Sequence, residues 1–239
     1  MKRGRKRRGW AYLLPALLFL GGLVLLLYPR VTDRLYRGAV QNQKAAFEKQ
    51  VTDKQAAPAE AEPPLEALYR ELQRRNAALF SERQKDLVDP WSYEQPGIDL
   101  TEYGLEGNVI GFVSIPKMDV ELPILLGANA ENMREGAVHL TETSYPIGGE
   151  NTNSVIAAHR GASETDMFRH IEKLELGDEV IIENFRETLV YEVVELRIIA
   201  PTDVDQLLIQ EGRDMVTLFT CHPYPQNYQR YVVFCERKP

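Results

Sequence analysis

One long apolar segment stands near the start of the chain. Trp10–Tyr28, WAYLLPALLFLGGLVLLLY, contains 19 residues and no charge. As an α-helix it would be about 28 Å long, which is close to the thickness of the hydrocarbon core of a bilayer. Aromatic residues lie at or near both ends of the segment, where membrane proteins concentrate Trp and Tyr. The pattern predicts a transmembrane anchor over residues 10–28.

Charge is distributed unevenly around this segment. Residues 1–9 hold six Lys or Arg and no acid, and because the whole chain carries −7, the remainder carries −13. Since the cytoplasmic flanks of membrane helices are rich in Lys and Arg, we expect residues 1–9 to be a basic cytoplasmic tip and the rest of the chain to be extracytoplasmic. The alternatives are a buried core helix and a cleaved signal peptide, although LLLYPRV offers no cleavage site between small residues. The acidic main body argues against nucleic acid as a partner, because phosphate binding needs a basic surface.

Residues 29–84 are predicted to form extracytoplasmic helices with a linker. A thin apolar stripe over residues 31–51 indicates a polar helix, which the three prolines of QAAPAEAEPP (55–64) bring to an end. A second helix is predicted where apolar residues recur at helical spacing: Leu65, Leu68, Tyr69, Leu72, Leu79 and Phe80. We expect that face to pack against the domain that follows.

From Asn108 onward the hydrophobic period changes to two. Short runs rich in β-branched and aromatic residues are separated by Gly, Pro, Asn and Asp: VIGFVSI, ELPILL, SVIAAH, DEVIIENF, TLVYEVVELRIIA, MVTLFTC and RYVVFC. Seven or eight such strands predict that residues 108–239 form a mainly β domain, either a barrel or a sandwich. Short helical inserts are expected near residues 165–174 and 203–210.

Cys221 is the candidate nucleophile. It ends the run VTLFTC, so a rigid strand stands behind it and a loop in front. The chain has one other cysteine, Cys235, and two cysteines are too few for a disulfide framework or a zinc–thiolate site. A buried, inert thiol is the alternative interpretation of Cys221.

Two further residues are placed to assist a thiol. His159 ends another strand, SVIAAH, and pairs naturally with Cys221. Arg230 begins the last strand, where a guanidinium can donate hydrogen bonds to a developing oxyanion. If Arg230 faces the site, Cys235 points to the other face of the strand, so we expect it to remain a free thiol.

The other three histidines have weaker claims. His222 adjoins Cys221, but adjacent strand residues point to opposite faces, which makes it a poor base. We expect His139 to be structural and His170 to lie at the surface. No histidine pair has the spacing of metal ligands, and no carboxylate cluster of the calcium-loop kind is present, so we predict neither a metal nor a cofactor.

Together these residues resemble the signature of the sortases, the cysteine transpeptidases of Gram-positive bacteria. TLFTC at 217–221 resembles their TLxTC motif, in which Leu218 and Thr220 flank the cysteine. HRG at 159–161 resembles the end of their fourth strand, and Arg230 matches their third catalytic residue. The resemblance covers about residues 85–237. It implies an eight-stranded β-barrel with the site at the ends of the fourth, seventh and eighth strands.

The lead-in segment, residues 85–107, narrows the resemblance. Asp89-Pro90-Trp91 resembles the DP(F/W) lid motif of class C, pilus-building sortases, which also carry extra N-terminal helices. The resemblance implies that Asp89 pairs with Arg230 and that Trp91 covers Cys221. Class C members often have a second, C-terminal transmembrane helix, and this sequence has no counterpart of it before Pro239.

The implied reaction is acyl transfer. Cys221 would attack the Thr carbonyl of an LPxTG-type sorting signal, and an amine would resolve the thioacyl-enzyme. The amine is a pilin lysine in a pilus-building enzyme and a cell-wall precursor in a sortase that attaches proteins to the wall. Two alternatives use no sorting chemistry: a thiol protease or amidase with water as acceptor, and a non-catalytic, membrane-tethered binding scaffold.

Overall fold

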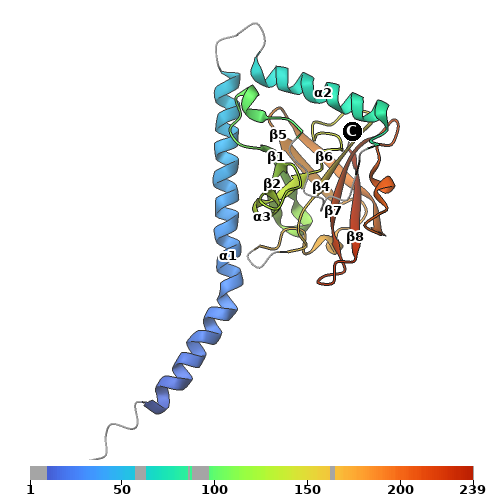
Figure 1. Cartoon of the computed structure of the whole chain (residues 1–239). Coiled ribbons are helices and arrows are strands. Elements are labelled where there is room, and N and C mark those ends of the chain that lie inside the picture. The colour runs from blue at the N-terminus through green and yellow to red at the C-terminus, as the bar shows by residue number, and fades with distance from the viewer. Residues whose placement is uncertain (1–9, 57–62, 86, 88–96, 162–164, 239) are drawn as a thin grey trace, which may run out of the picture.

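A computed structural model describes residues 10–56, 63–85, 87, 97–161 and 165–238. Two long helices, α1 (Trp10–Gln55) and α2 (Pro64–Glu82), precede a closed barrel of eight strands (Figure 1). The strands are β1 (Val109–Ile115), β2 (Val120–Leu126), β3 (Ala137–His139), β4 (Thr152–Ala157), β5 (Glu179–Asn184), β6 (Thr188–Ile199), β7 (Asp214–His222) and β8 (Gln229–Arg237). The predicted fold class, an eight-stranded barrel behind N-terminal helices, is confirmed. The basic tip, most of the predicted linker and the lid tripeptide Asp89-Pro90-Trp91 lie outside the described residues.

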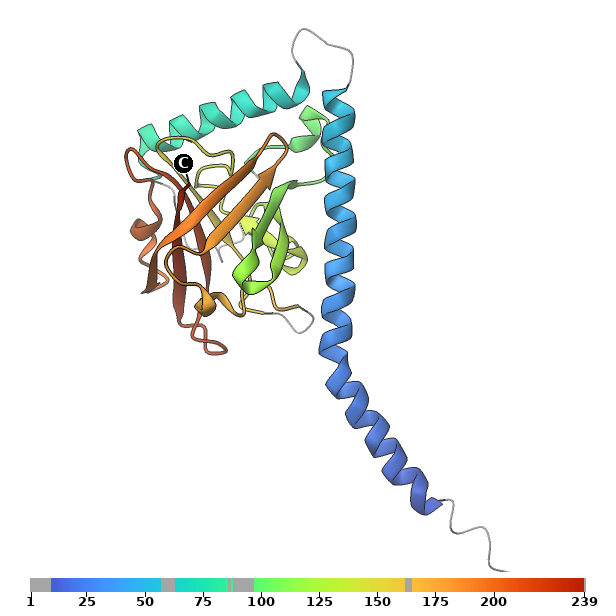
Figure 2. The same cartoon turned by 180° about the vertical axis from the view of Figure 1, so that it is seen from behind.

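α1 joins the predicted anchor and the polar helix into one helix of 46 residues. It is the one helix in the described part of the chain that is long and apolar enough to cross a membrane. Residues 12–30 are exposed throughout, as expected for a segment that faces lipid. The ribbon bends once, within its dark blue N-terminal part (Figures 1 and 2). Pro15 and Pro29 lie inside the helix, and a proline that removes a backbone hydrogen bond is the usual cause of such a bend.

The barrel mixes antiparallel and parallel pairs. Its strands follow the order β1-β2-β3-β4-β7-β8-β6-β5 before closing on β1. β2–β3 and β4–β7 are parallel, and the other pairs are antiparallel. β3 has three residues, too few to show an alternating pattern, which explains why the sequence shows seven clear runs. The two expected helical inserts are short 3₁₀ turns, η4 (Ile171–Lys173) and η5 (Val204–Leu207).

β7 and β8 bury both of their faces. Alternate residues enter the larger hydrophobic cluster, shared with α1, α2 and β1: Val216, Leu218, Val233 and Cys235. The intervening residues enter a second cluster, shared with β4 and η5: Met215, Phe219, Val232 and Phe234. Burial raises the pKa of the Cys235 thiol, and Cys235 is not in a disulfide. The prediction that it stays a free thiol on the face opposite Arg230 is confirmed.

α1 packs along one side of the barrel. Val40 and Phe47 on α1 are buried, and Phe47 meets Phe112 of β1 edge-on with ring centroids 5.8 Å apart. Between these two contacts, Lys44 Nζ lies 2.9 Å from a Glu121 carboxylate oxygen and 2.7 Å from one of Glu183. These contacts come from β1, β2 and β5, so the helix is fixed to the sheet over several turns.

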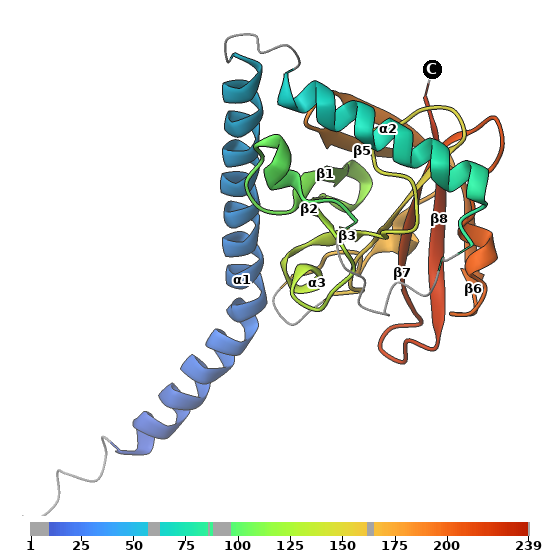
Figure 3. The same ribbon diagram turned by 45° about the horizontal axis from the view of Figure 1, so that its top comes forward.

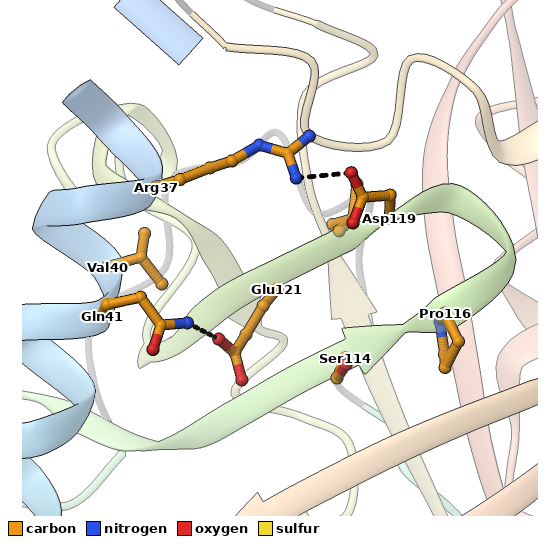
Figure 4. A pocket seen from close by; sticks show the side chains of 8 residues that line it. Arg37, Val40, Gln41, Ser114, Pro116, Asp119 and Glu121 are labelled. Carbon is orange, nitrogen blue, oxygen red and sulfur yellow. Dashed lines mark hydrogen bonds and ion pairs between the residues drawn. The ribbon is translucent and has the colours of Figure 1, made fainter. Parts of the chain in front are cut away.

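A cleft of about 300 Å³ remains between α1 and the β1–β2 hairpin. Figure 4 shows two contacts that bridge it, an ion pair of 2.7 Å between Arg37 and Asp119 and a hydrogen bond from Gln41 to Glu121. None of the candidate catalytic residues lines this cleft. The cleft therefore belongs to the joint between the helix and the barrel.

α2 lies across one end of the barrel (Figure 3). Leu65, Leu68 and Leu72 are buried, which confirms the predicted docking face, whereas Phe80 remains 36% exposed. Asn76 adds a polar anchor, because its amide oxygen accepts a hydrogen bond of 2.8 Å from the backbone N–H of Tyr145. Tyr145 belongs to the β3–β4 connection, so α2 covers the end of the barrel at which β4 begins.

Candidate active site

Cys221 and Arg230 are directly opposite each other in the β7–β8 ladder. Residues that face each other across an antiparallel pair project from the same face of the sheet. The Arg230 side chain is buried, and its Nη1 donates hydrogen bonds to the backbone oxygens of Asn227 and Gln229, at 3.2 and 3.0 Å. The turn between the strands therefore holds the guanidinium beside the thiol.

His159 arrives at the same place from β4. In the parallel β4–β7 ladder Ala157 pairs with Phe219, and both side chains lie in the second hydrophobic cluster. His159 and Cys221 each come two residues later, and the pairing continues beyond the end of β4, because Ala158 N–H donates to Phe219 O at 3.2 Å. By the alternation of strand side chains, His159 projects on the face of Phe219 and Cys221.

Thr220 and Leu218 flank the cysteine but face away from it. Leu218 packs in the larger cluster, on the opposite face from Phe219. Thr220 Oγ1 donates a hydrogen bond of 2.7 Å to Ala158 O and is fully buried. These two residues of the motif thus fix β7 against its neighbours and leave the surface around the thiol to other residues.

A buried arginine supports the site from behind. Arg160 is 5% exposed, and its Nη1 donates to the backbone oxygen of Cys221 at 3.3 Å and to Nδ1 of His222 at 2.6 Å. Its Nη2 forms an ion pair of 2.5 Å with Glu172. His222 must be neutral and protonated on Nε2 to accept at Nδ1, and burial followed by the Arg160 charge lowers its pKa. The HRG motif contains Arg160, but no signal in the sequence gives this residue a role, because its burial and its contacts with Cys221 and Glu172 exist only in the folded chain.

Burial also lowers the pKa of His159. Its imidazole is therefore mainly neutral near pH 7, the state in which it can accept a proton from a thiol. A neutral base, a thiol and a guanidinium on one face are the groups needed for nucleophilic acyl transfer with an oxyanion donor.

The other two histidines, His139 and His170, make different contacts. His139 is buried in β3, where its Nε2 lies 3.2 Å from Thr143 O and 3.0 Å from Ser144 O and its ring stacks on Tyr145. It is structural, as predicted. His170 has 44% of its side chain exposed and lies 3.7 Å from Asp166. Among the described residues, no group of three or more His, Cys, Asp or Glu has the arrangement of a metal site.

The comparison with known proteins agrees with this geometry. A family model described as the sortase domain matches residues 113–238, more than half of the chain. The chain belongs to the sortase family, whose members are cysteine transpeptidases. Sortase D of Bacillus subtilis is 29% identical over 134 residues, which are 55% of this chain and 65% of that protein, so the match spans slightly less than two thirds of its length. Sortase A of Bacillus anthracis is 28% identical over 156 residues, 64% of this chain and 72% of that protein.

Solved structures narrow the similarity to class C. Sortase C of Streptococcus pneumoniae superposes with a TM-score of 0.72 at 31% identity, covering 83% of this chain and 97% of that one. Sortase C1 of Streptococcus agalactiae gives a TM-score of 0.73 at 32% identity, covering 82% and 97%. The resemblance to class C sortases that the sequence motifs indicated is confirmed.

Proposed function

We propose that this chain is a membrane-anchored class C sortase in which Cys221, His159 and Arg230 catalyse transpeptidation. The single observation that carries the assignment is the β7–β8 register, which sets Cys221 opposite Arg230. A pilus role is supported by the solved neighbours, one of which is described by its pilin substrate specificity and another as the sortase C1 of a streptococcal pilus island.

The first half of the reaction forms a thioester. His159 accepts the thiol proton, and the thiolate of Cys221 attacks the Thr carbonyl carbon of an LPxTG-type signal. Arg230 donates hydrogen bonds to the oxyanion of the tetrahedral intermediate. The C–N bond then breaks, and the proton held by His159 passes to the leaving amine.

The second half consumes the thioester. An acceptor amine attacks the acyl carbon, His159 removes a proton from it, and Cys221 leaves as a thiol. We propose a pilin lysine as the acceptor, which gives an isopeptide bond; a cell-wall precursor amine is the second candidate. Both require the catalytic domain to be extracytoplasmic, and we propose that α1 anchors it there with the basic tip in the cytoplasm.

The test is an assay with a labelled LPxTG-type peptide and an added amine. Ligation that depends on the amine supports the sortase, cleavage that does not depend on it supports a thiol protease, and no turnover supports a scaffold. Cys221→Ala should abolish the thioester, and His159→Ala and Arg230→Ala should each cost at least about 100-fold in rate. His222→Ala is the matched control and should cost much less. If His222→Ala were the more damaging histidine change, the assignment of His159 would be wrong.

We further propose that Asp89-Pro90-Trp91 is a lid over Cys221. The support is the motif and the existence of a lid in the S. agalactiae neighbour, for which a lid mutant has been solved. Asp89→Ala with Trp91→Ala should then increase the rate at which a small thiol reagent labels Cys221, and an unchanged rate would remove the lid from the proposal.

A further inference from the structure

Exposed apolar side chains gather at one end of the barrel. Five large hydrophobic side chains outside α1 are exposed among the described residues. Leu176 (68% exposed) lies just before β5, Ile198 (50%) lies near the end of β6, and Tyr224 (51%) and Tyr228 (64%) lie in the β7–β8 turn. Phe80, the fifth, is on α2 at the opposite end.

The strand directions place this end beside the catalytic residues. β4 and β7 are parallel and finish there, and β6 finishes there because it is antiparallel to β8, with Ile199 opposite Arg230. β5 begins there, since Ile181 near its start pairs with Ser114 near the end of β1. The four exposed side chains therefore lie at the end of the barrel that carries Cys221, which we call the catalytic rim.

The apolar N-terminal part of α1 extends beyond the barrel at this same end. The β1–β2 turn lies at this rim and is joined to α1 through the Arg37–Asp119 ion pair. The opposite end of β1 is joined to a later residue of α1, because Gln50 Oε1 accepts from Glu106 N–H at 2.8 Å. α1 thus runs along the barrel, and its N-terminal, apolar segment projects beyond the catalytic rim.

The distance along α1 brings the rim to the membrane surface. Arg37 follows Tyr28 by nine residues, about 13 Å of helix. The headgroup layer occupies about 5–8 Å beyond the hydrocarbon core. The dark red β7–β8 turn reaches further along α1 than the β1–β2 turn does, to about the level of the helix bend (Figures 1 and 2). Because α1 is unbroken between the anchor and its contacts on β1 and β2, no flexible linker sets this height.

We propose that the catalytic rim rests on the membrane that α1 spans, with Leu176, Ile198, Tyr224 and Tyr228 among the lipid headgroups. Tyr is favoured in this layer because its ring is apolar, whereas its hydroxyl group forms hydrogen bonds with water. The acids of the rim are partly neutralised by its own cations, as Lys117 is 3.0 Å from Glu175, so the contact depends on apolar side chains and needs no anionic lipid. The active site would then open at the bilayer surface and favour substrates whose reactive segment lies close to it. The inference rests on the proposed membrane anchor.

The experiment uses the full chain in vesicles of zwitterionic lipid. In a Cys221→Ala background, Tyr228→Cys or Leu176→Cys carries an environment-sensitive fluorophore, and Cys235 is too deeply buried to be labelled. The matched control is Glu211→Cys, an exposed position in the turn before β7, at the other end of the barrel. Lipids with a nitroxide on the headgroup serve as quenchers, and flotation with the vesicles reports insertion of α1.

We expect the probes at 228 and 176 to lose emission with the nitroxide lipid, at low and high salt alike, and the probe at 211 to keep its emission. Unquenched probes at 228 and 176 in protein that floats with the vesicles would overturn the membrane contact and leave the anchor intact. Protein that does not float would overturn the anchor itself. The fluorophores at 228 and 176 could instead report an apolar environment only at high protein density and without quenching by the nitroxide lipid. That result would assign the rim to a contact with a second copy of the chain and refute the lipid contact.

Discussion

His139 should make the barrel lose stability in mildly acidic solution. Burial lowers the pKa of this side chain to about 4, whereas an unfolded chain leaves it near 6.5. Well above pH 6.5 the imidazole is neutral in both states and contributes no pH dependence. As the pH falls below 6.5, only the unfolded state gains the proton, so the free energy of unfolding decreases until the folded protein also titrates near pH 4.

The size of the loss follows from these two pKa values. The contribution of His139 should fall by about 2 kcal/mol at pH 5 and by about 3 kcal/mol at pH 4, relative to neutral pH. Its cause is local, because a proton on both ring nitrogens gains no acceptor in a site where Nε2 already faces two backbone oxygens. The loss should be felt in β3 and the β3–β4 connection, which lead into the strand that carries His159.

The assay is urea unfolding of the chain in mild detergent, followed by circular dichroism between pH 4 and pH 7.5. His139→Gln removes the titrating group while keeping an amide donor, and His170→Gln is the matched surface control. The stability of the His139 variant should depend less on pH by the amounts above, and that of the His170 variant should follow the wild type. Parallel pH profiles of the wild type and the His139 variant, or an NMR titration of His139 near pH 6.5, would refute the reasoning.

Three further predictions concern the barrel and the site. Gly111→Ala should lower the free energy of unfolding by about 1–3 kcal/mol, because an added Cβ would meet the backbone oxygen of Glu183 on β5; urea unfolding measures it. Arg160→Gln should lower kcat about 10- to 100-fold with little change in KM, since it releases the backbone oxygen of Cys221, whereas the exposed neighbour Lys173→Gln should leave both unchanged. Arg160→Gln should also raise the pKa of His222 in an NMR titration, because the Arg160 charge lowers it. An unchanged His222 pKa would contradict the contact between Arg160 and His222. His159 should titrate below pH 6.5 in the same experiment, because burial disfavours its charged form.

Much of the fold could be predicted because it depends on local pattern. The alternation of apolar residues identified seven strand segments, and the apolar stripe of α2 identified the face that buries Leu68 and Leu72. The short β3 could not be identified this way, since three residues contain no period. Closure into a barrel also lies beyond local pattern, because it depends on the pairing of β1 with β5, some 70 residues apart.

The candidate site could be predicted from the sequence for a different reason. Successive side chains of a strand point to alternate faces, so the face of each residue follows from its position in the sequence. Once Arg230 was assigned to the site with Cys221, Cys235 could be expected on the opposite face. The role of Arg160 could not be predicted from the alternation of side chains. Its contacts with Cys221 and Glu172 come from three separate segments, and only the folded chain brings them together.

The site depends on one particular register, and the structure contains side chains that specify it. A slip of one residue between β4 and β7 would set Thr220 or His222 level with His159 in place of Cys221. Polar bonds tie β7 to β4, from Thr217 Oγ1 to Asn153 Oδ1 and from Thr220 Oγ1 to Ala158 O, each at 2.7 Å. Because both hydroxyls are fully buried, a shifted register would leave them without acceptors, at a cost of about 1–3 kcal/mol each. Hydrophobic packing tolerates similar apolar residues at many positions, so these buried threonines, rather than the apolar core, fix which residue of β7 lies level with His159.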